Sequence, residues 1–124
     1  MKLRIRGNSI RLRLTQSEVA QLASNGCVED SISFGSEELR YAVAVGRNGE
    51  RVKADLRDNR ITIYVPADAI AKWADSEQVG IEEGQAISKG WLHILIEKDF
   101  TCLKPRAGDE DEDTFANPLA AGNG

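Results

Sequence analysis

Apolar and polar residues alternate at the start of the chain, which predicts a β-hairpin. Two alternating stretches, Lys2 to Arg6 and Ile10 to Leu14, flank Gly7-Asn8-Ser9, whose residues tolerate the positive φ of a tight turn. The same arrangement is expected further along, where residues 52–56 and 60–65 flank Arg57-Asp58-Asn59. The chain therefore contains two similar hairpins.

The whole pattern returns after 51 residues, which indicates an internal duplication. Residues 10–14 match residues 61–65 in apolar phase, and the correspondence extends through both halves. Late in the repeat, it pairs Tyr41, Val43 and Val45 with Leu92, Ile94 and Ile96. Chance likeness of amphipathic segments is the alternative explanation. The two repeats are expected at about 1–48 and 52–99.

Each half is also expected to contain one short helix followed by two strands. Residues 15–18 form a capping box before an apolar stripe, and Asn25-Gly26 ends this first helix. Pro66 suits the first turn of the second helix. The four later strands are expected at residues 28–34, 40–45, about 78–81 and 91–97.

These elements predict an α+β domain built from duplicated ββαββ units. We expect the eight strands to form a barrel-like or two-layer sheet with two short helices. The 124 residues, 41% hydrophobic and 29% charged, suit one soluble domain over residues 1–106. The apolar periodicity stops after Lys104, so residues 107–124 are expected to be an acidic tail.

The net charge of −4 is unevenly distributed. Five basic residues and no acid lie within the first thirteen residues, whereas Asp109 to Asp113 is an unbroken acidic run. Without that run the chain has 15 acidic and 16 basic residues, so nucleic acid is not expected as a partner. No apolar stretch suits a membrane span or a signal peptide, and Cys27 and Cys102 are expected to be reduced, which predicts a cytoplasmic protein.

The alternation of the first hairpin separates its apolar residues from its cations. One face has Leu3, Ile5, Ile10, Leu12 and Leu14, and the other has Lys2, Arg4, Arg6, Arg11 and Arg13. The polar face of the second hairpin includes Lys53. If the two polar faces converge, they form a cationic concavity for phosphate or carboxylate groups. The candidate anion ligands are therefore Arg4, Arg6, Arg11, Arg13 and Lys53, and the alternative is a solvated outer face.

Other candidate chemistry lies toward the end of the chain. His93 is expected to be a structural histidine. The alternatives are a metal site completed by Cys102, Asp99 or Glu97, and a nucleophilic pair with Cys102. Glu97 and Asp99 could hold a divalent cation, or could belong to a segment that only leads the chain out of the domain. The acidic run could bind a cation or a basic partner, fold back over the arginines, or stay solvated.

Three segments carry a resemblance to known proteins. Residues 2–19, residues 97–103 and Asn117-Pro118 resemble a small family of uncharacterised bacterial proteins of unknown function, over nearly the whole chain. The topology and arginine-lined strands are more distantly similar to the CYTH or triphosphate tunnel superfamily. The eight-stranded barrels of that superfamily hold triphosphates between basic residues and carboxylate-bound metal. Its opening glutamate-x-glutamate-x-lysine is replaced here by Lys2-x-Arg4-x-Arg6.

We therefore expect a small binding or accessory protein without a cofactor, rather than an enzyme. Its expected partner is a phosphate-containing small molecule. One alternative is a metal-dependent phosphohydrolase of triphosphate tunnel type, with a divalent metal on Glu97 and Asp99. The other is a protein-interaction module that binds its partner through the acidic tail.

Overall fold

The computed structural model describes residues 1–99, which form eight strands and two helices. They follow one another as β1 (Lys2–Arg6), β2 (Ser9–Leu14), α1 (Gln16–Asn25), β3 (Cys27–Ser33), β4 (Glu38–Gly46), β5 (Lys53–Arg57), β6 (Arg60–Pro66), α2 (Ala67–Ala74), β7 (Gly80–Ile87) and β8 (Gly90–Lys98). The expected α+β class is confirmed.

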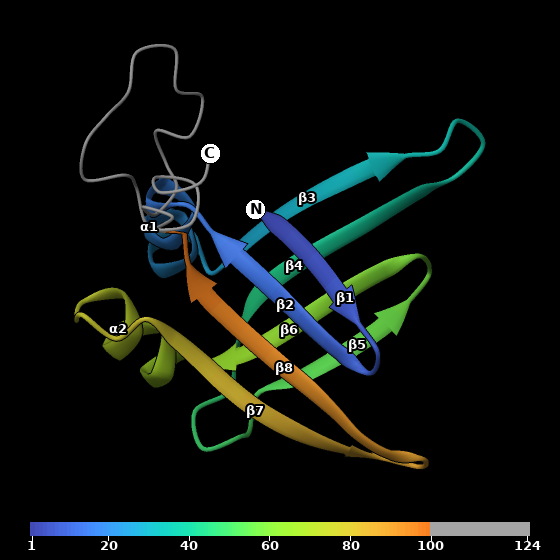
Figure 1. The fold of residues 1–124 in the computed structure, drawn as a ribbon. Helices are drawn as coiled ribbons and strands as arrows, with labels where there is room; N and C mark the ends of the chain where they lie inside the picture. Colours follow the sequence, from blue (N-terminus) through green and yellow to red (C-terminus); the bar gives the residue numbers. More distant parts are fainter. Residues whose placement is uncertain (100–124) are drawn as a thin grey trace, which may run out of the picture.

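The strands form two four-stranded sheets that pack face to face (Figure 1). Sheet A has the strand order β1-β2-β8-β7, and sheet B has the order β3-β4-β6-β5. Each sheet combines one hairpin from each half of the chain, and the two central strands of each sheet are parallel. Within residues 1–99 the sheets do not close into a barrel, so the two-layer alternative describes the fold.

Corresponding hairpins of the two halves pair in the same register. Lys2 lies opposite Arg13 in the β1–β2 hairpin, and Lys53 lies opposite Tyr64 in the β5–β6 hairpin, so both strands keep the offset of the sequence repeat. The β3–β4 and β7–β8 hairpins also correspond, at an offset that is larger by two positions. The chain between α2 and β7 accommodates this difference.

One apolar core lies between the sheets and against the helices. Its central members come from the four inner strands and are almost completely buried: Leu12, Leu14, Val43, Ile63, Val65, Ile94 and Ile96. Successive strand residues point to opposite faces. The polar residues of the same strands therefore lie on the outer faces of the two sheets.

Both helices lie at one end of the sheets, away from the hairpin tips (Figure 1). The expected capping box is confirmed, because Thr15 Oγ1 accepts the Glu18 N–H at 3.2 Å and Glu18 Oε1 accepts the Thr15 N–H at 2.9 Å. Gly26, in the left-handed conformation at φ 82°, ends α1 as expected. Leu22 of α1 and Trp73 of α2 are completely buried against the core.

Pro66 occupies a different position from the one expected. It is the last residue of β6 and the N-cap of α2, with φ −56° and ψ 144°, rather than a residue of the first helical turn. Its side chain cannot cap the helix. Asn48, in the connection between β4 and β5, caps the helix instead, because its Oδ1 accepts the Asp68 N–H at 2.9 Å.

The strand before β8 is longer than expected. β7 continues to Ile87, well beyond the expected end at Ile81. The sequence pattern did not predict the second half of β7, because Glu83 and Gln85 lie on the inner face of this strand and interrupt its apolar alternation. Gln85 accepts the Ala54 N–H at 2.6 Å and donates to the Ala54 C=O at 3.2 Å, so its amide pairs with the edge of β5.

Tyr41, on the inner face of sheet B, has a pKa raised above 10.0. Burial is the main cause, and the negative charges of Asp30, its cross-strand partner, and Glu18 add to it. The Met1 amino group is the cation that contacts these two carboxylates. It donates to Glu18 Oε2 at 2.7 Å and lies 3.8 Å from Asp30 Oδ2. The folded state holds the tyrosine proton more tightly than the unfolded state. The contribution of Tyr41 to stability is therefore full below about pH 10 and is lost as the pH rises through its folded pKa.

We expect Asp30→Asn to move the pKa of Tyr41 part of the way back toward its ordinary value, because one of the two nearby negative charges is removed. Tyrosinate absorbance as a function of pH measures this shift, and Tyr41→Phe identifies the transition that belongs to Tyr41. An unchanged transition in Asp30→Asn would mean that Asp30 contributes nothing to the raised pKa.

Candidate functional site

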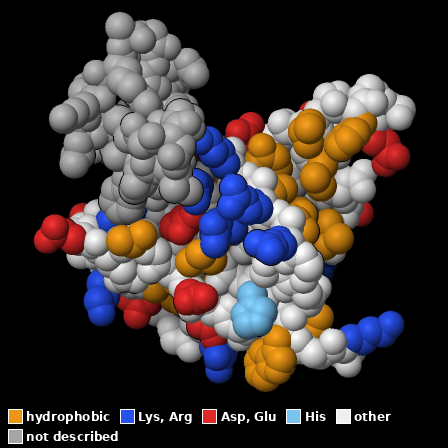
Figure 2. Space-filling view, in the orientation of Figure 1, with side chains coloured by type: hydrophobic (Ala, Val, Ile, Leu, Met, Phe, Trp, Pro, Cys, Tyr) orange, Lys and Arg blue, Asp and Glu red, His pale blue; other side chains and the backbone are white. Residues whose placement is uncertain are grey.

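Five cationic side chains lie on the outer face of sheet A, and we call this surface the arginine face: Lys2, Arg4, Arg6, Arg11 and Arg13. The apolar residues between them point into the core, so the cations face outward. Figure 2 shows Lys and Arg side chains gathered beside the single histidine of the chain. The arginine face is thus on the surface of the molecule and not inside a tunnel.

Like charges lie opposite each other on this face. Lys2 is the cross-strand partner of Arg13, and Arg4 is the partner of Arg11. Like charges in such positions destabilise a sheet. Together with Leu3, the four side chains line a hollow of about 230 Å³. A bound anion would reduce the repulsion between them.

Two carboxylates neutralise part of this charge. Glu97, on β8, accepts a hydrogen bond from Arg13 Nε at 2.6 Å and lies 3.7 Å from Arg11 Nε. The carboxylate of Asp99 is almost completely buried, and its Oδ2 lies 3.4 Å from Lys2 Nζ. Both proposed metal ligands therefore contact cations, which compete with a metal ion for their oxygens.

The charges of Arg4 and Arg6 are not neutralised by neighbouring carboxylates of the described part of the chain. Within residues 1–99, neither guanidinium has a carboxylate partner. The five cations of this face are accompanied by three carboxylates, those of Glu82, Glu97 and Asp99, so the excess is two positive charges. This excess is centred on the first hairpin.

Lys53, the fifth candidate ligand, lies on the other sheet. Its Nζ is 6.0 Å from the centre of the Tyr64 ring, on the outer face of sheet B. It lines a separate hollow of about 830 Å³ together with Arg51, Asp55 and Arg57. Both sheets turn their apolar faces to one core, so the two polar hairpin faces point away from each other. The structure therefore brings four arginines together without Lys53.

The predicted metal site has few ligands in the structure. Among residues 1–99, no group of three or more His, Cys, Asp or Glu side chains could hold one ion. Magnesium and calcium sites in proteins use several oxygen ligands. Metal binding by Glu97 and Asp99 stays a prediction, and it would require displacement of Arg13 and Lys2.

His93 and Cys27 lie on different sheets. The His93 ring is exposed on the outer face of sheet A rather than packed in the core, and the backbone N–H of His93 donates to the Asn8 backbone C=O at 3.1 Å. Cys27, at the start of β3, is a partly buried free thiol. Cys102 and the acidic run Asp109–Asp113 lie outside the described residues, so the roles suggested for them stay predictions.

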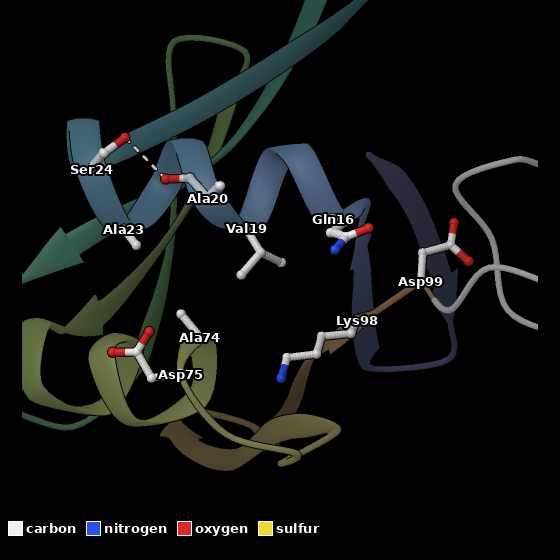
Figure 3. A pocket seen from close by; sticks show the side chains of 9 residues that line it. All are labelled: Gln16, Val19, Ala20, Ala23, Ser24, Ala74, Asp75, Lys98 and Asp99. Carbon is white, nitrogen blue, oxygen red and sulfur yellow. Dashed lines mark hydrogen bonds between the residues drawn. The ribbon is translucent and has the colours of Figure 1, made fainter.

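Another hollow, of about 700 Å³, lies between α1 and α2 (Figure 3). Small and apolar side chains from both helices line it, together with Lys98 and Asp99. Lys98 Nζ donates to the Ser76 C=O at 2.7 Å and lies 5.9 Å from the centre of the Trp73 ring. Because this amine is already engaged, we take the arginine face as the better candidate for anion binding.

The sequence pattern did not single out Asn8 and Trp91, which lie beside the arginine face. Trp91 is 59% exposed, and its C=O accepts a hydrogen bond from Asn8 Nδ2 at 2.6 Å. The strand alternation contained the signal for Trp91, because it places Trp91 in phase with His93 and out of phase with Leu92.

Comparisons with known proteins identify a family without an activity. A family model described as a family of unknown function (DUF7009) matches residues 1–119. Searches of curated proteins and of solved structures found no match. No helix within residues 1–99 has the length and apolar character needed to cross a membrane. The likeness to the triphosphate tunnel superfamily stays a prediction.

Proposed function

The chain belongs to the DUF7009 family, whose function is unknown, and we propose that it binds phosphate-containing anions on the arginine face. The two successive cation–cation pairs of the first hairpin carry this proposal. A surface selected for stability alone would place opposite charges at such positions. A phosphate group in the hollow would bring negative charge between the paired cations.

The free guanidinium groups suit phosphate chemically. Arginine presents parallel N–H donors that match two phosphate oxygens, and such charge-assisted contacts are stronger than neutral hydrogen bonds. Arg4 and Arg6 have no carboxylate partner to give up within residues 1–99. Glu97 is engaged with Arg13, which would have to be displaced before this carboxylate could hold a metal. We therefore propose binding rather than metal-dependent hydrolysis.

Replacement of Arg4 and Arg11 with alanine together is expected to weaken binding of inorganic triphosphate about 100-fold or more. Each lost charge-assisted hydrogen bond removes about 1.5–3 kcal/mol. The fold should stay intact, because both side chains are on the outer face, their removal ends a like-charge contact, and Glu97 keeps its hydrogen bond from Arg13 when Arg11 is lost. Isothermal titration calorimetry measures the affinity, and thermal unfolding without ligand checks the fold.

A matched control removes two arginines from the outer face of sheet B. Arg40 and Arg57 lie within 3.1 and 3.9 Å of the carboxylates of Glu38 and Asp55. Replacing both with alanine changes the net charge equally but should leave the triphosphate affinity nearly unchanged. Equal affinity in the unaltered chain and the Arg4/Arg11 variant would refute the proposed site.

We also propose that the two halves of the chain arose by duplication. The hairpins that begin the halves share one register at the offset of the sequence repeat, and the hairpins that end them share one register at a slightly larger offset. The same offsets relate sheet A to sheet B, strand by strand. On this basis Val43 corresponds to Ile96, rather than to Ile94 as one uniform offset would give.

A further inference from the structure

An exposed aromatic ring lies on the same outer face as the arginines. Trp91, opposite Ala86 in the β7–β8 hairpin, is 59% exposed. Residues two apart in a strand point to the same side, so Trp91 shares its face with His93, Leu95 and Glu97. Tryptophan is enriched at binding surfaces because its large apolar ring also has a polar edge.

Asn8, in the turn of the first hairpin, holds the β8 backbone at Trp91. Its Nδ2 donates to the Trp91 backbone C=O at 2.6 Å, and its backbone C=O accepts the His93 backbone N–H at 3.1 Å. Gly84 on the neighbouring strand has no side chain to occupy the space beside the indole, and a Cβ placed there would lie 3.6 Å from Trp91 Cε3. The ring is therefore held beside bare backbone, with more than half of its surface open to a ligand.

The spacing between Trp91 and the arginines suits a ligand with a ring at one end and anionic groups at the other. Arg11, on β2, lies beside Leu95 of β8. Leu95 is four positions from Trp91 on that strand. At about 3.3 Å per residue the separation along β8 is about 13 Å, and the long arginine side chain shortens it. A sugar with a chain of phosphates bridges a gap of this order. The exposed His93 lies between the two ends.

We propose that the ligand of the arginine face is a free nucleotide, with its base stacked on Trp91 and its phosphates bound by Arg4 and Arg11. This inference rests on the proposed anion binding and adds the chemical class of the ligand. Stacking on tryptophan tolerates any base, because every base has a π-face. The phosphates add negative charge to a face on which Glu97 and Asp99 neutralise only part of the positive charge, and they reach Arg4, which has no carboxylate partner within residues 1–99.

A free nucleotide fits better than a nucleic acid strand. The chain has a net charge of −4, which opposes a long polyanion. Proteins that bind single strands use several aromatic residues along a charged groove. On the outer face of sheet A within residues 1–99, the aromatic rings are those of Trp91 and His93. One stacked base with its own phosphates satisfies this surface.

Calorimetry with ATP and with inorganic triphosphate on the full chain tests the inference. We expect ATP to bind more tightly than triphosphate. Trp91→Leu should weaken ATP binding about 5- to 150-fold, which corresponds to about 1–3 kcal/mol for one stacked base, and should leave triphosphate binding unchanged. Phe34→Leu, which alters an exposed ring outside sheet A, is the matched control and should change neither affinity.

Tryptophan fluorescence gives a second readout that needs no variant. ATP should quench the emission of the unaltered chain whereas triphosphate should not, because Trp91 is exposed and Trp73 is completely buried.

Each contrary result has a different meaning. Triphosphate binding without tighter ATP binding, and without an effect of Trp91→Leu, would overturn the nucleotide inference and leave anion binding intact. Failure of both ligands to bind would overturn the proposed function itself. Tighter binding of a single-stranded oligonucleotide than of ATP would overturn the choice of a free nucleotide.

Discussion

Trp73→Ala is expected to reduce the free energy of unfolding by about 3–5 kcal/mol, a large share of the roughly 5–15 kcal/mol typical of a domain. Trp73, a residue of α2, is completely buried in the core. Its Nε1 donates to the Val79 C=O at 3.1 Å, and Lys98 Nζ lies 5.9 Å from the ring centre. Alanine would leave a cavity and remove the donor of that hydrogen bond.

Trp91→Ala provides the matched control, because it makes the same substitution at a position that is 59% exposed. The stability change should stay within about 0.5–1 kcal/mol, as is usual for surface positions. Urea unfolding of both variants, monitored by circular dichroism, measures the difference. Equal losses at the two positions would contradict the packing of Trp73 described above.

Leu12→Ala is expected to cost about 2–5 kcal/mol, the second large effect. Leu12 is 1% exposed on β2, and its parallel partner on β8 is Ile96, which is also completely buried. The substitution would therefore open a cavity at the centre of the core, where both sheets contribute side chains. The strand itself should persist, because its backbone pairs on both sides.

Leu56→Ala is the control for this substitution. Leu56 lies on the inner face of sheet B near the tip of its hairpin, yet it is 71% exposed. Its loss should cost less than about 0.5 kcal/mol. Chemical denaturation decides the comparison, and a cost at Leu56 that matched the cost at Leu12 would mean that the sheets close over the hairpin tip.

The contrast between these positions marks the limit of what the sequence predicts. Strict alternation assigned Leu3, Ile5, Ile10, Leu12 and Leu14 correctly to one face, because a strand repeats every two residues. It could not rank them. Ile5 is 61% exposed and Leu14 is completely buried, because the helices lie against one end of the sheets and not the hairpin tips. That difference depends on the packing of whole elements.

Partner choice between hairpins was also beyond the sequence pattern. The alternating apolar residues of β2 would match any strand that alternates in the same way. The residues of β2 and its neighbours in sequence do not determine that it pairs with β8 rather than with β4. β7 was predicted too short for a similar reason. Glu83 and Gln85 break its alternation and are accommodated only because Arg51 and the Ala54 backbone lie within hydrogen-bond reach.

The candidate site was predicted in part. Alternation identified the four arginines as one surface. It could not show that Lys53 lies on the opposite side of the molecule, because that depends on how the two sheets pack. Trp91 joins that surface only because β8 pairs with β2 and brings its outer residues beside the first hairpin. The part of the site made by neighbours in sequence was predictable, and the part made by distant strands was not.

The strand order also determines when each sheet can form during synthesis of the chain. Sheet B joins β4 to β6, and the partners Arg40 and Arg60 are only 20 residues apart in the chain. Sheet A joins β2 to β8, and Arg13 must wait for Glu97, 84 residues later. At about 5–20 residues per second, that interval is roughly 4–17 s on the ribosome. Throughout it β2 has no partner on its β8 side, so that edge of the first hairpin stays unpaired until residues 90–98 have been synthesised.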